Sequence, residues 1–282
     1  MNESIQLKMN NENEKIWTDD SIRWLDTKKD QDSNQEESNE CFDIFNDNVA
    51  TFHFKFNHPT EEGKEVNIHL KGYKYDSHET YQSTGLTIWL AAEHLCHYLV
   101  KHHGILHGKQ ILELGAGLGL CGILVHTIAS NSNISITDGD TGALKKLREN
   151  VAENLHSLSS SNVSCRQLLW GKETSQVFLD TFNKGIQYHL IIASDILYSP
   201  VVVEPLWQSI QVLLHREGIF LMAFAKRKVP VTIDTFLQAA SLAGFRYECV
   251  RDEVVGKLDS NAPEEHVWIY SFQWKREEAQ DL

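Results

Sequence analysis

The chain has 282 residues, of which 41% are hydrophobic, and a formal net charge of −13. That length suits a single α/β domain with a tail and is ample for a sizeable core. The negative charge argues against phosphate-backbone binding as the main activity, because nucleic-acid binders usually present a basic face, and it favours a basic protein partner.

Residues 1–48 are predicted to be an acidic, disordered tail. The first 40 residues hold eleven Asp and Glu against five Lys and Arg, with many Asn, Gln and Ser. Such a composition buries too little apolar surface to offset the entropy of ordering. Within the tail, only the apolar cluster from Ile16 to Leu25 could dock as a short helix.

Residues 49–282 are predicted to form one α/β domain. TFHFKF and VNIHLKGYKY alternate with period two around the turn-prone HPTEEG, which predicts a β-hairpin over 51–75. Apolar residues at helical spacing predict a helix from Leu86 to Val100. Strands and helices then alternate through the core, 84–275. Expected strands cover 109–114, 133–138, 162–169, 187–194, 217–225, 245–251 and 266–274. Expected helices cover 118–130, 140–156, 200–214 and 230–243.

This alternation indicates a doubly wound, Rossmann-like sheet of seven mostly parallel strands. Runs such as YHLIIAS and GIFLMAFA are apolar on both faces, as buried parallel strands should be. In this architecture a ligand binds outside the carboxyl ends of the strands, beside the first strand. The strand ends therefore supply the candidate site residues: Glu113, Asp138, Trp170 and Asp195.

The most informative segment is KQILELGAGLGLCG at 109–122, an apolar strand that ends on an acid and breaks into glycines. Glycines at 115, 117 and 119 let the backbone take positive φ and bring bare N–H groups close to a ligand. The apolar run that follows predicts a helix whose N-terminus points at the same place. The segment is typical of a nucleotide-binding turn, although a tight turn without a ligand would use the same glycines.

The spacing favours S-adenosylmethionine (SAM) over a dinucleotide. A dinucleotide site has G-x-G-x-x-G directly after the strand, and counted from Gly115 the third glycine falls on Leu120. Counted from Gly117 the pattern fits, but it then starts past the end of the strand. Glu113 would gain nothing beside a pyrophosphate, whereas it suits the ammonium group of SAM.

Asp138 lies in the segment ISITDGD, at the end of an expected strand and between 19 and 23 residues after the glycines. A carboxylate there can accept both hydroxyls of a ribose, although a plain turn residue is the alternative. The next acid, Asp140, is the predicted N-cap of the helix at 140–156. Trp170 follows the third strand and is placed to lie near an adenine, although an aromatic at a strand end is more often part of a core.

SDILYSP at 194–200 puts a carboxylate and a phenol, Asp195 and Tyr198, at the lip of the same pocket. A lysine ammonium must lose its proton before its lone pair can attack a methyl group. Asp195 is expected to hold the amine, and Tyr198 to wall the channel and exclude water. The Pro-Pro-aromatic motif used here by enzymes that methylate nucleic-acid bases is absent.

The sequence predicts neither a metal site nor a membrane anchor. Five cysteines lack CxxC spacing, and the dense histidines between 94 and 107 are better explained as a solvated helix end. No apolar run approaches a membrane span, and the N-terminus lacks a signal-peptide core. A cytoplasmic protein is expected, with nuclear residence left open.

Five segments in this order resemble the seven-strand protein-lysine methyltransferases of methyltransferase family 16: TGLTIWLAAEHL (84–95), ILELGAGLGLCGI (111–123), ITDGD (136–140), LLWG (168–171) and ASDILY (193–198). Members of that family modify chaperones, translation elongation factors and related proteins. The resemblance covers roughly residues 50 to 275 and implies the class I methyltransferase fold. It implies a SAM site lined by Trp89, Gly115, Ala116, Gly117, Asp138, Trp170 and Ser194. Asp195 and Tyr198 match the family's Asp-x-x-Tyr signature, which is implied to serve lysine recognition and catalysis. Ser194 departs from the small apolar residue that many relatives have there.

The leading hypothesis is a monomeric, SAM-dependent protein-lysine N-methyltransferase that releases S-adenosylhomocysteine. Its implied partner is a protein such as a chaperone or translation factor. One alternative with the same fold methylates an arginine, a histidine or a small molecule. A different class is a catalytically silent SAM-binding scaffold, which the intact glycines and Asp-x-x-Tyr disfavour.

Overall fold

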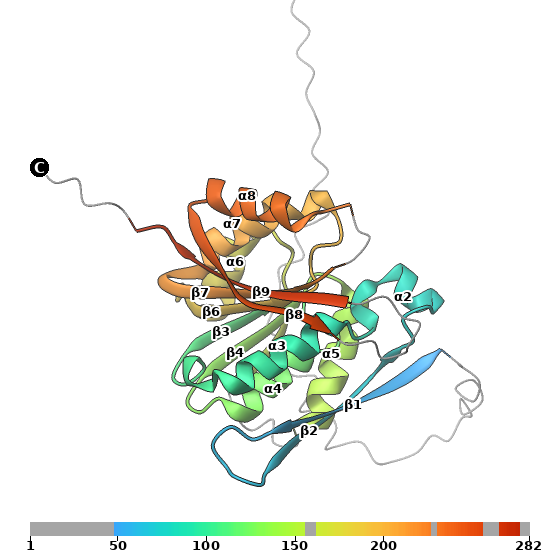
Figure 1. Cartoon of the computed structure of the whole chain (residues 1–282). Coiled ribbons are helices and arrows are strands. Elements are labelled where there is room, and N and C mark those ends of the chain that lie inside the picture. The colour runs from blue at the N-terminus through green and yellow to red at the C-terminus, as the bar shows by residue number, and fades with distance from the viewer. Residues whose placement is uncertain (1–47, 156–161, 227–229, 256–264, 277–282) are drawn as a thin grey trace, which may run out of the picture. The chain divides into compact units, whose positions relative to one another are not determined.

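The computed structural model describes residues 48–155, 162–226, 230–255 and 265–276 (Figure 1). The predicted acidic tail, with its apolar cluster at 16–25, lies outside these residues except for its last position. The chain divides into two units, 1–46 and 47–282, and every described residue belongs to the second. Among the described helices, none has the length and apolarity needed to cross a bilayer.

A seven-stranded sheet forms the centre of the domain. Its strands lie in the order β5-β4-β3-β6-β7-β9-β8. β9 runs antiparallel to both of its neighbours, and the other pairs are parallel. The strands are β3 Gln110–Leu114, β4 Asn133–Asp138, β5 Val163–Gln167, β6 Tyr188–Ser194, β7 Leu214–Ala225, β8 Phe245–Val255 and β9 Glu265–Trp274. The predicted sheet of seven mostly parallel strands is confirmed.

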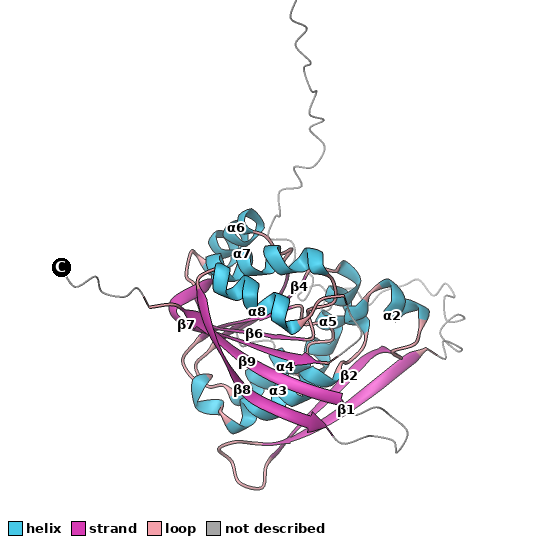
Figure 2. Cartoon of the chain, turned by 45° about the horizontal axis from the view of Figure 1, so that its top comes forward, coloured by secondary structure: helices cyan, strands magenta, loops and turns pink. Residues whose placement is uncertain are grey.

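Helices cover both faces of this sheet (Figures 1 and 2). One face carries α3 Leu90–Lys101, α4 Leu120–Ile128 and α5 Thr141–Asn154, and the other carries α6 Lys172–Asn183, α7 Val203–Leu213 and α8 Ile233–Leu242. Neighbouring strand residues point to opposite faces, so Ile111 belongs to the first hydrophobic cluster and Leu112 to the second. Burial of both faces explains the continuous apolar runs of β6 and β7.

The predicted hairpin is present as a separate two-stranded antiparallel sheet, β1 Val49–Asn57 and β2 Glu65–Tyr73. One of its faces buries Phe56, Val66, Ile68 and Leu70 in the cluster that also holds residues of α3, α4 and α5. A lone hairpin is marginally stable in water, so this packing is what stabilises it. β2 lies directly against α4 and α5.

The structure contains helices that were not predicted from the sequence. One is α6, whose buried residues are Ser175, Phe178 and Leu179. Another is the short α2, His78–Gln82, capped by Ser77. The helix expected from Leu86 begins at Leu90, because Thr84–Leu86 form a 3₁₀ turn, η1. The helix expected from 200 begins with a 3₁₀ turn, Pro200–Val202.

Asp140 caps α5 as predicted. Its Oδ1 accepts a hydrogen bond from Ala143 N at 2.7 Å and another from Ser83 Oγ at 3.0 Å. Asp140 thereby satisfies one of the helix's unpaired N–H groups and also holds the segment before η1.

Replacing Asp140 by Ala should lower the melting temperature by about 2–4 °C, because a lost N-cap costs about 1 kcal/mol in a domain of this size. Thermal unfolding of the full chain measures the change. Asp234→Ala is the control, since Asp234 is exposed in the first turn of α8, where Thr232 supplies the cap. Equal losses in the two variants would contradict the capping role.

Candidate functional site

A cavity of about 470 Å³ opens at the carboxyl ends of β3, β4 and β6. The structure places all ten predicted site residues on its wall: Trp89, Glu113, Gly115, Ala116, Gly117, Asp138, Trp170, Ser194, Asp195 and Tyr198. They come from segments far apart in the sequence, brought together because parallel strands end at one edge of the sheet. The role of each in binding or catalysis remains a prediction.

The glycine turn lies at the centre of this wall. Gly115, Gly117 and Gly119 have φ values of 62°, 55° and 92°, a region that L side chains rarely adopt. A Cβ on Gly115 would lie 2.8 Å from Ile196 Cγ2, and one on Gly117 would lie 3.0 Å from the carbonyl oxygen of Gly85. The turn therefore requires glycine for both its backbone conformation and its close packing.

Gly119 is also the N-cap residue of α4, and it has no side chain to cap the helix. The first backbone N–H groups of α4 consequently lack a side-chain acceptor from the cap position. A ligand carboxylate in the cavity would suit this helix N-terminus, where the macrodipole favours negative charge.

Asp138 connects the end of β4 to the turn. Its Oδ2 accepts a hydrogen bond from Gly117 N, and its Oδ1 accepts one from Asp140 N, both at 2.9 Å. Burial raises the pKa of this carboxyl, and the two backbone N–H donors oppose that rise. Each oxygen retains a lone pair, so the carboxylate can fix the turn and still accept hydrogen bonds from a diol.

Glu113, one residue before the end of β3, is 2% exposed, and its Oε2 has no hydrogen-bond partner. Burial, together with the negative charge of Asp138, raises its pKa to about 8. This oxygen lies against α4, where a Cβ on Gly122 would be 2.5 Å from it. Burial of a carboxyl oxygen without a hydrogen bond is costly when the group is ionised. That Glu113 faces the ammonium group of a cofactor stays a prediction.

Asp195 has a structural role that the sequence does not show. Its Oδ1 accepts a hydrogen bond from Ala225 N at 3.0 Å, at the end of β7. Its Oδ2 accepts one from Ala91 N at 3.3 Å, in the first turn of α3. The residue is held at φ 53°, an uncommon conformation for a side-chain-bearing residue. These contacts fix the carboxylate at the lip of the cavity.

Tyr198 lies three residues further on and is 49% exposed. Partial burial raises the pKa of its phenol, and the negative charges of Asp138 and Asp140 add to that rise to a smaller extent. The hydroxyl therefore remains protonated at neutral pH and can donate a hydrogen bond at the entrance of the cavity.

Two tryptophans close the cavity from different sides. Trp89 Nε1 donates to the carbonyl oxygen of Thr84 at 2.8 Å, which ties together the two ends of the segment 84–89. Trp170 lies beside the glycine turn, where a Cβ on Gly115 would be 3.4 Å from its Cζ2. Trp170 also packs against the hydrophobic cluster beneath α6 and α7. The sequence offered two alternatives for this residue, pocket wall and core, and it belongs to both.

The segment around η1 contributes cavity residues that sequence reasoning missed: Gln82, Ser83, Thr84 and Gly85. A Cβ on Gly85 would lie 2.8 Å from Ala143 Cβ and 3.4 Å from Gly117 Cα. This segment therefore covers the glycine turn at close range. Its signal in the sequence is the TG pair that opens the motif at 84, of which only Trp89 was assigned to the site.

The charge of the wall is one-sided. Four carboxylic residues line the cavity, namely Glu113, Asp138, Asp140 and Asp195, while none of its described lining residues is Lys or Arg. Of the four, Glu113 is mainly uncharged at neutral pH without a ligand cation, because its pKa is about 8. Such a wall attracts cations and repels a pyrophosphate. This distribution fits a ligand that carries a sulfonium and an ammonium group, and it disfavours a dinucleotide.

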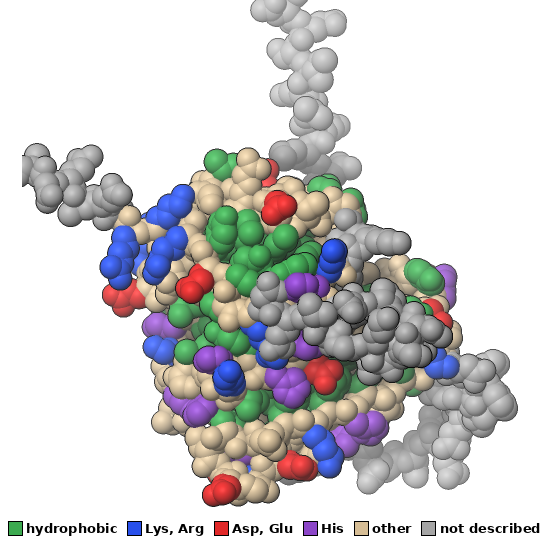
Figure 3. Space-filling model, in the orientation of Figure 1, with side chains coloured by type: hydrophobic (Ala, Val, Ile, Leu, Met, Phe, Trp, Pro, Cys, Tyr) green, Lys and Arg blue, Asp and Glu red, His purple; other side chains and the backbone are tan. Residues whose placement is uncertain are grey.

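No histidine lines the cavity among the described residues. Of the five histidines between 94 and 107, only His97 and His102 are exposed, whereas His94, His103 and His107 are partly buried, so the interpretation as a solvated helix end fits two of the five. Figure 3 shows histidine side chains spread over the surface around α3 and the hairpin. Within the described ranges, no group of three or more His, Cys, Asp or Glu is placed to hold a metal ion.

The strand order, the glycine turn and the acid-lined cavity define a class I SAM-dependent methyltransferase fold. A protein described as a SAM-dependent methyltransferase from Streptococcus mutans shares this fold, with a TM-score of 0.50 at 13% identity over 78% of this chain and 55% of that one. A family model described as lysine methyltransferase matches residues 75–242. The chain therefore belongs to the lysine methyltransferase family.

Curated relatives support this membership. The chain is 29% identical over 164 residues to the protein-lysine N-methyltransferase EFM3 of Chaetomium thermophilum, covering 58% of this chain and 48% of the relative. It is 34% identical over 136 residues to the protein N-lysine methyltransferase METTL21A of Danio rerio, covering 48% and 58%. The METTL21A of Xenopus tropicalis is 32% identical over 181 residues, covering 64% and 72%. The chain thus spans about half the length of the first two relatives.

The difference in stability between the Glu113→Gln variant and the wild type should shift in favour of the variant as the pH rises. The pKa of Glu113 in the folded protein, about 8, exceeds its model value of 4.5. Its contribution to stability is therefore fully present below about pH 4.5 and is lost as the pH rises through about 8. The melting temperature of the variant minus that of the wild type should increase by several degrees between about pH 5 and about pH 8. Parallel curves for the two proteins would contradict the burial of an ionisable, unpaired carboxyl.

Proposed function

We propose that this protein transfers methyl groups from SAM to the side-chain amine of a lysine in a partner protein. The observation that carries the proposal is the cavity wall, where carboxylates and a glycine turn meet without a basic residue among the described lining. Both the methyl donor and a lysine substrate are cations, so one wall suits both. The relatives named as protein-lysine N-methyltransferases support the same reaction.

The chain's residues divide into two groups around this reaction. We assign cofactor binding to the turn 115–117 together with Trp89, Glu113, Asp138, Trp170 and Ser194. Asp138 would hold the ribose hydroxyls, and Glu113 would pair with the ammonium group. When bound, SAM supplies a methyl group on a sulfonium sulfur, and its transfer to the amine nitrogen leaves S-adenosylhomocysteine as product.

Asp195 and Tyr198 act on the substrate in this proposal. The carboxylate of Asp195 would draw the ammonium group to the lip of the cavity and orient it by accepting a hydrogen bond. The amine must lose a proton before attack, and the exposed lip lets that proton pass to solvent. Tyr198 would restrict the entrance, which keeps water from the reacting atoms.

We also propose finer assignments. The resemblance implies a substrate of the chaperone or translation-factor kind. We further propose that the enzyme acts as a monomer and that it works in the cytoplasm or also in the nucleus. The alternatives differ in where the methyl group goes. It would go to an arginine, a histidine or a small molecule in the alternatives with the same fold, and a silent scaffold would transfer no methyl group.

Labelled SAM, incubated with the full chain and a cell extract, tests the reaction. Mass spectrometry of the labelled protein should locate the methyl group on a lysine side chain. Label on an arginine, a histidine or a small molecule would replace the proposal with that alternative, and the absence of any transferred label would contradict it.

Asp195→Asn tests the catalytic residue, and Asn tolerates positive φ better than most residues. Its amide can accept from only one of the two backbone N–H groups that the carboxylate binds, so thermal unfolding must first show that the variant is folded. Transfer should fall about 100-fold or more, since the side chain loses the charge that orients the amine. Affinity for SAM, measured by calorimetry, should stay within about threefold. Asp234→Asn, outside the cavity lining, is the control and should transfer like the wild type. Unchanged transfer in Asp195→Asn would refute its assigned role.

A further inference from the structure

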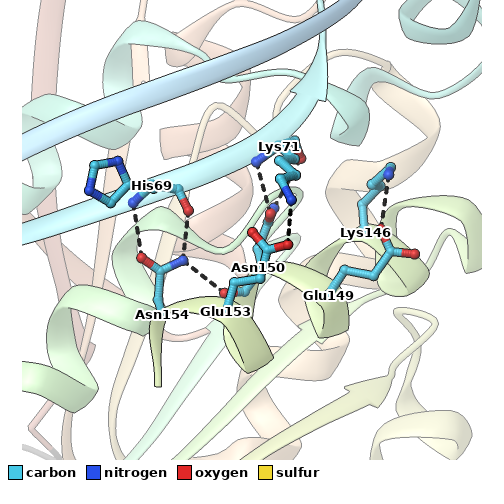
Figure 4. A network of polar contacts seen from close by, with 7 residues as sticks. All are labelled: His69, Lys71, Lys146, Glu149, Asn150, Glu153 and Asn154. Carbon is cyan, nitrogen blue, oxygen red and sulfur yellow. Dashed lines mark hydrogen bonds and ion pairs between the residues drawn. The ribbon is translucent and has the colours of Figure 1, made fainter. Parts of the chain in front are cut away.

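The edge of strand β2 is bonded to helix α5 through two asparagine side chains (Figure 4). Asn150 Oδ1 accepts from Lys71 N at 2.9 Å, and its Nδ2 donates to the carbonyl oxygen of Lys71 at 3.2 Å. Asn154 repeats the pattern two residues along the strand, accepting from His69 N at 2.9 Å and donating to its carbonyl oxygen at 2.7 Å. The two amides thus replace the neighbouring strand that β2 lacks on this edge.

Only Asn150 extends this attachment to the cavity. Its Nδ2 also donates to the carbonyl oxygen of Leu118 at 3.1 Å, inside the glycine turn. Asn154 makes its remaining bond to the carbonyl oxygen of Asn150, within its own helix, at 2.8 Å. Asn150 is fully buried, so water cannot replace the bonds of its amide.

Strand β2 also presses on the turn through its backbone. A Cβ on Gly72 would lie 2.5 Å from Leu118 Cδ1 and 2.7 Å from the carbonyl oxygen of Leu86. Leu118 lines the cavity, and Leu86 ends the η1 segment that covers it. The hairpin therefore meets the cofactor turn in two independent ways, although none of its residues lines the cavity.

The exposed ion pairs in the same region do not explain this connection. Lys71 Nζ lies 2.6 Å from Glu153 Oε1, and both side chains are about half exposed. Lys146 and Glu149 pair along α5 itself. Exposed pairs of this kind are screened by water and contribute little.

We propose that Asn150 is a positioning residue for the cofactor turn, and that the hairpin supports this turn from outside the cavity. Through Leu118, Asn150 holds the turn in the conformation in which Gly117 N meets Asp138. Without its amide, the buried carbonyl oxygen of Leu118 loses its donor and the turn shifts to find another. This inference rests on the proposed function in taking S-adenosyl compounds as the ligands of the turn.

Asn150→Ala and Asn154→Ala form a matched pair, because each removes two bonds to the backbone of β2 but only the first removes a bond to the turn. Binding of S-adenosylhomocysteine to the full chain, measured by calorimetry well below the melting temperature, separates the two roles. Asn150→Ala should weaken binding about tenfold, and Asn154→Ala should leave it within about twofold. In steady state, Asn150→Ala should raise the KM for SAM more than it lowers kcat.

Gly72→Ala tests the same connection between hairpin and cofactor turn from the hairpin side. If Asn150→Ala does not fold, this variant is the test of the proposal. It should also weaken binding several-fold, whereas Gly104→Ala, where an added Cβ meets no atom within 4 Å, should not. Wild-type affinity in Asn150→Ala, equal weakening in Asn154→Ala, or unchanged binding in Gly72→Ala when it alone can be measured would overturn the proposal. A wild-type protein that binds no S-adenosylhomocysteine would overturn the proposed function as well.

Discussion

Space for a side chain is missing at three positions of one turn, Gly115, Gly117 and Gly119, and the site depends on this constraint. The turn passes between Ile196 on one side and Gly85 on the other, and a Cβ on Gly119 would collide with Leu147. Because the backbone is enclosed this tightly, it can present its N–H groups to a ligand and hold Gly117 N against Asp138. The direction of α4 and the position of the acids around the cavity follow from the same path.

The electrostatics of the cavity describe a site built for cations. Glu113 is buried with an unpartnered oxygen, which destabilises the protein when the carboxyl is ionised. A bound ammonium group would offset that cost. The same carboxyl that lowers the stability of the ligand-free protein would then raise its affinity for a cationic ligand. Asp195 lies nearer the lip, where its backbone partners fix its orientation. In the proposed function the two acids would serve two different cations, one on the cofactor and one on the substrate.

Local signals in the sequence were sufficient for the sheet, the hairpin and the strand-end residues. The apolar runs, the glycine spacing and the Asp140 cap each depend on neighbours in the chain, so they could be predicted without a structure. The helix α6 was missed although its buried residues, Ser175, Phe178 and Leu179, follow helical spacing. The two backbone bonds of Asp195 and the three bonds of Asn150 could not be predicted, since their partners are far away in sequence and the register is set by packing. What the sequence did not reveal is therefore mainly how distant segments hold the site in place.

The central claim is that this acid-lined cavity binds a cationic nucleoside cofactor. The most direct test is calorimetric titration of the full chain with SAM and, separately, with NAD under the same buffer conditions. SAM should bind at least about tenfold more tightly than NAD, since four carboxylic residues and no described basic residue line the cavity. Equal affinity, or a preference for NAD, would contradict the account.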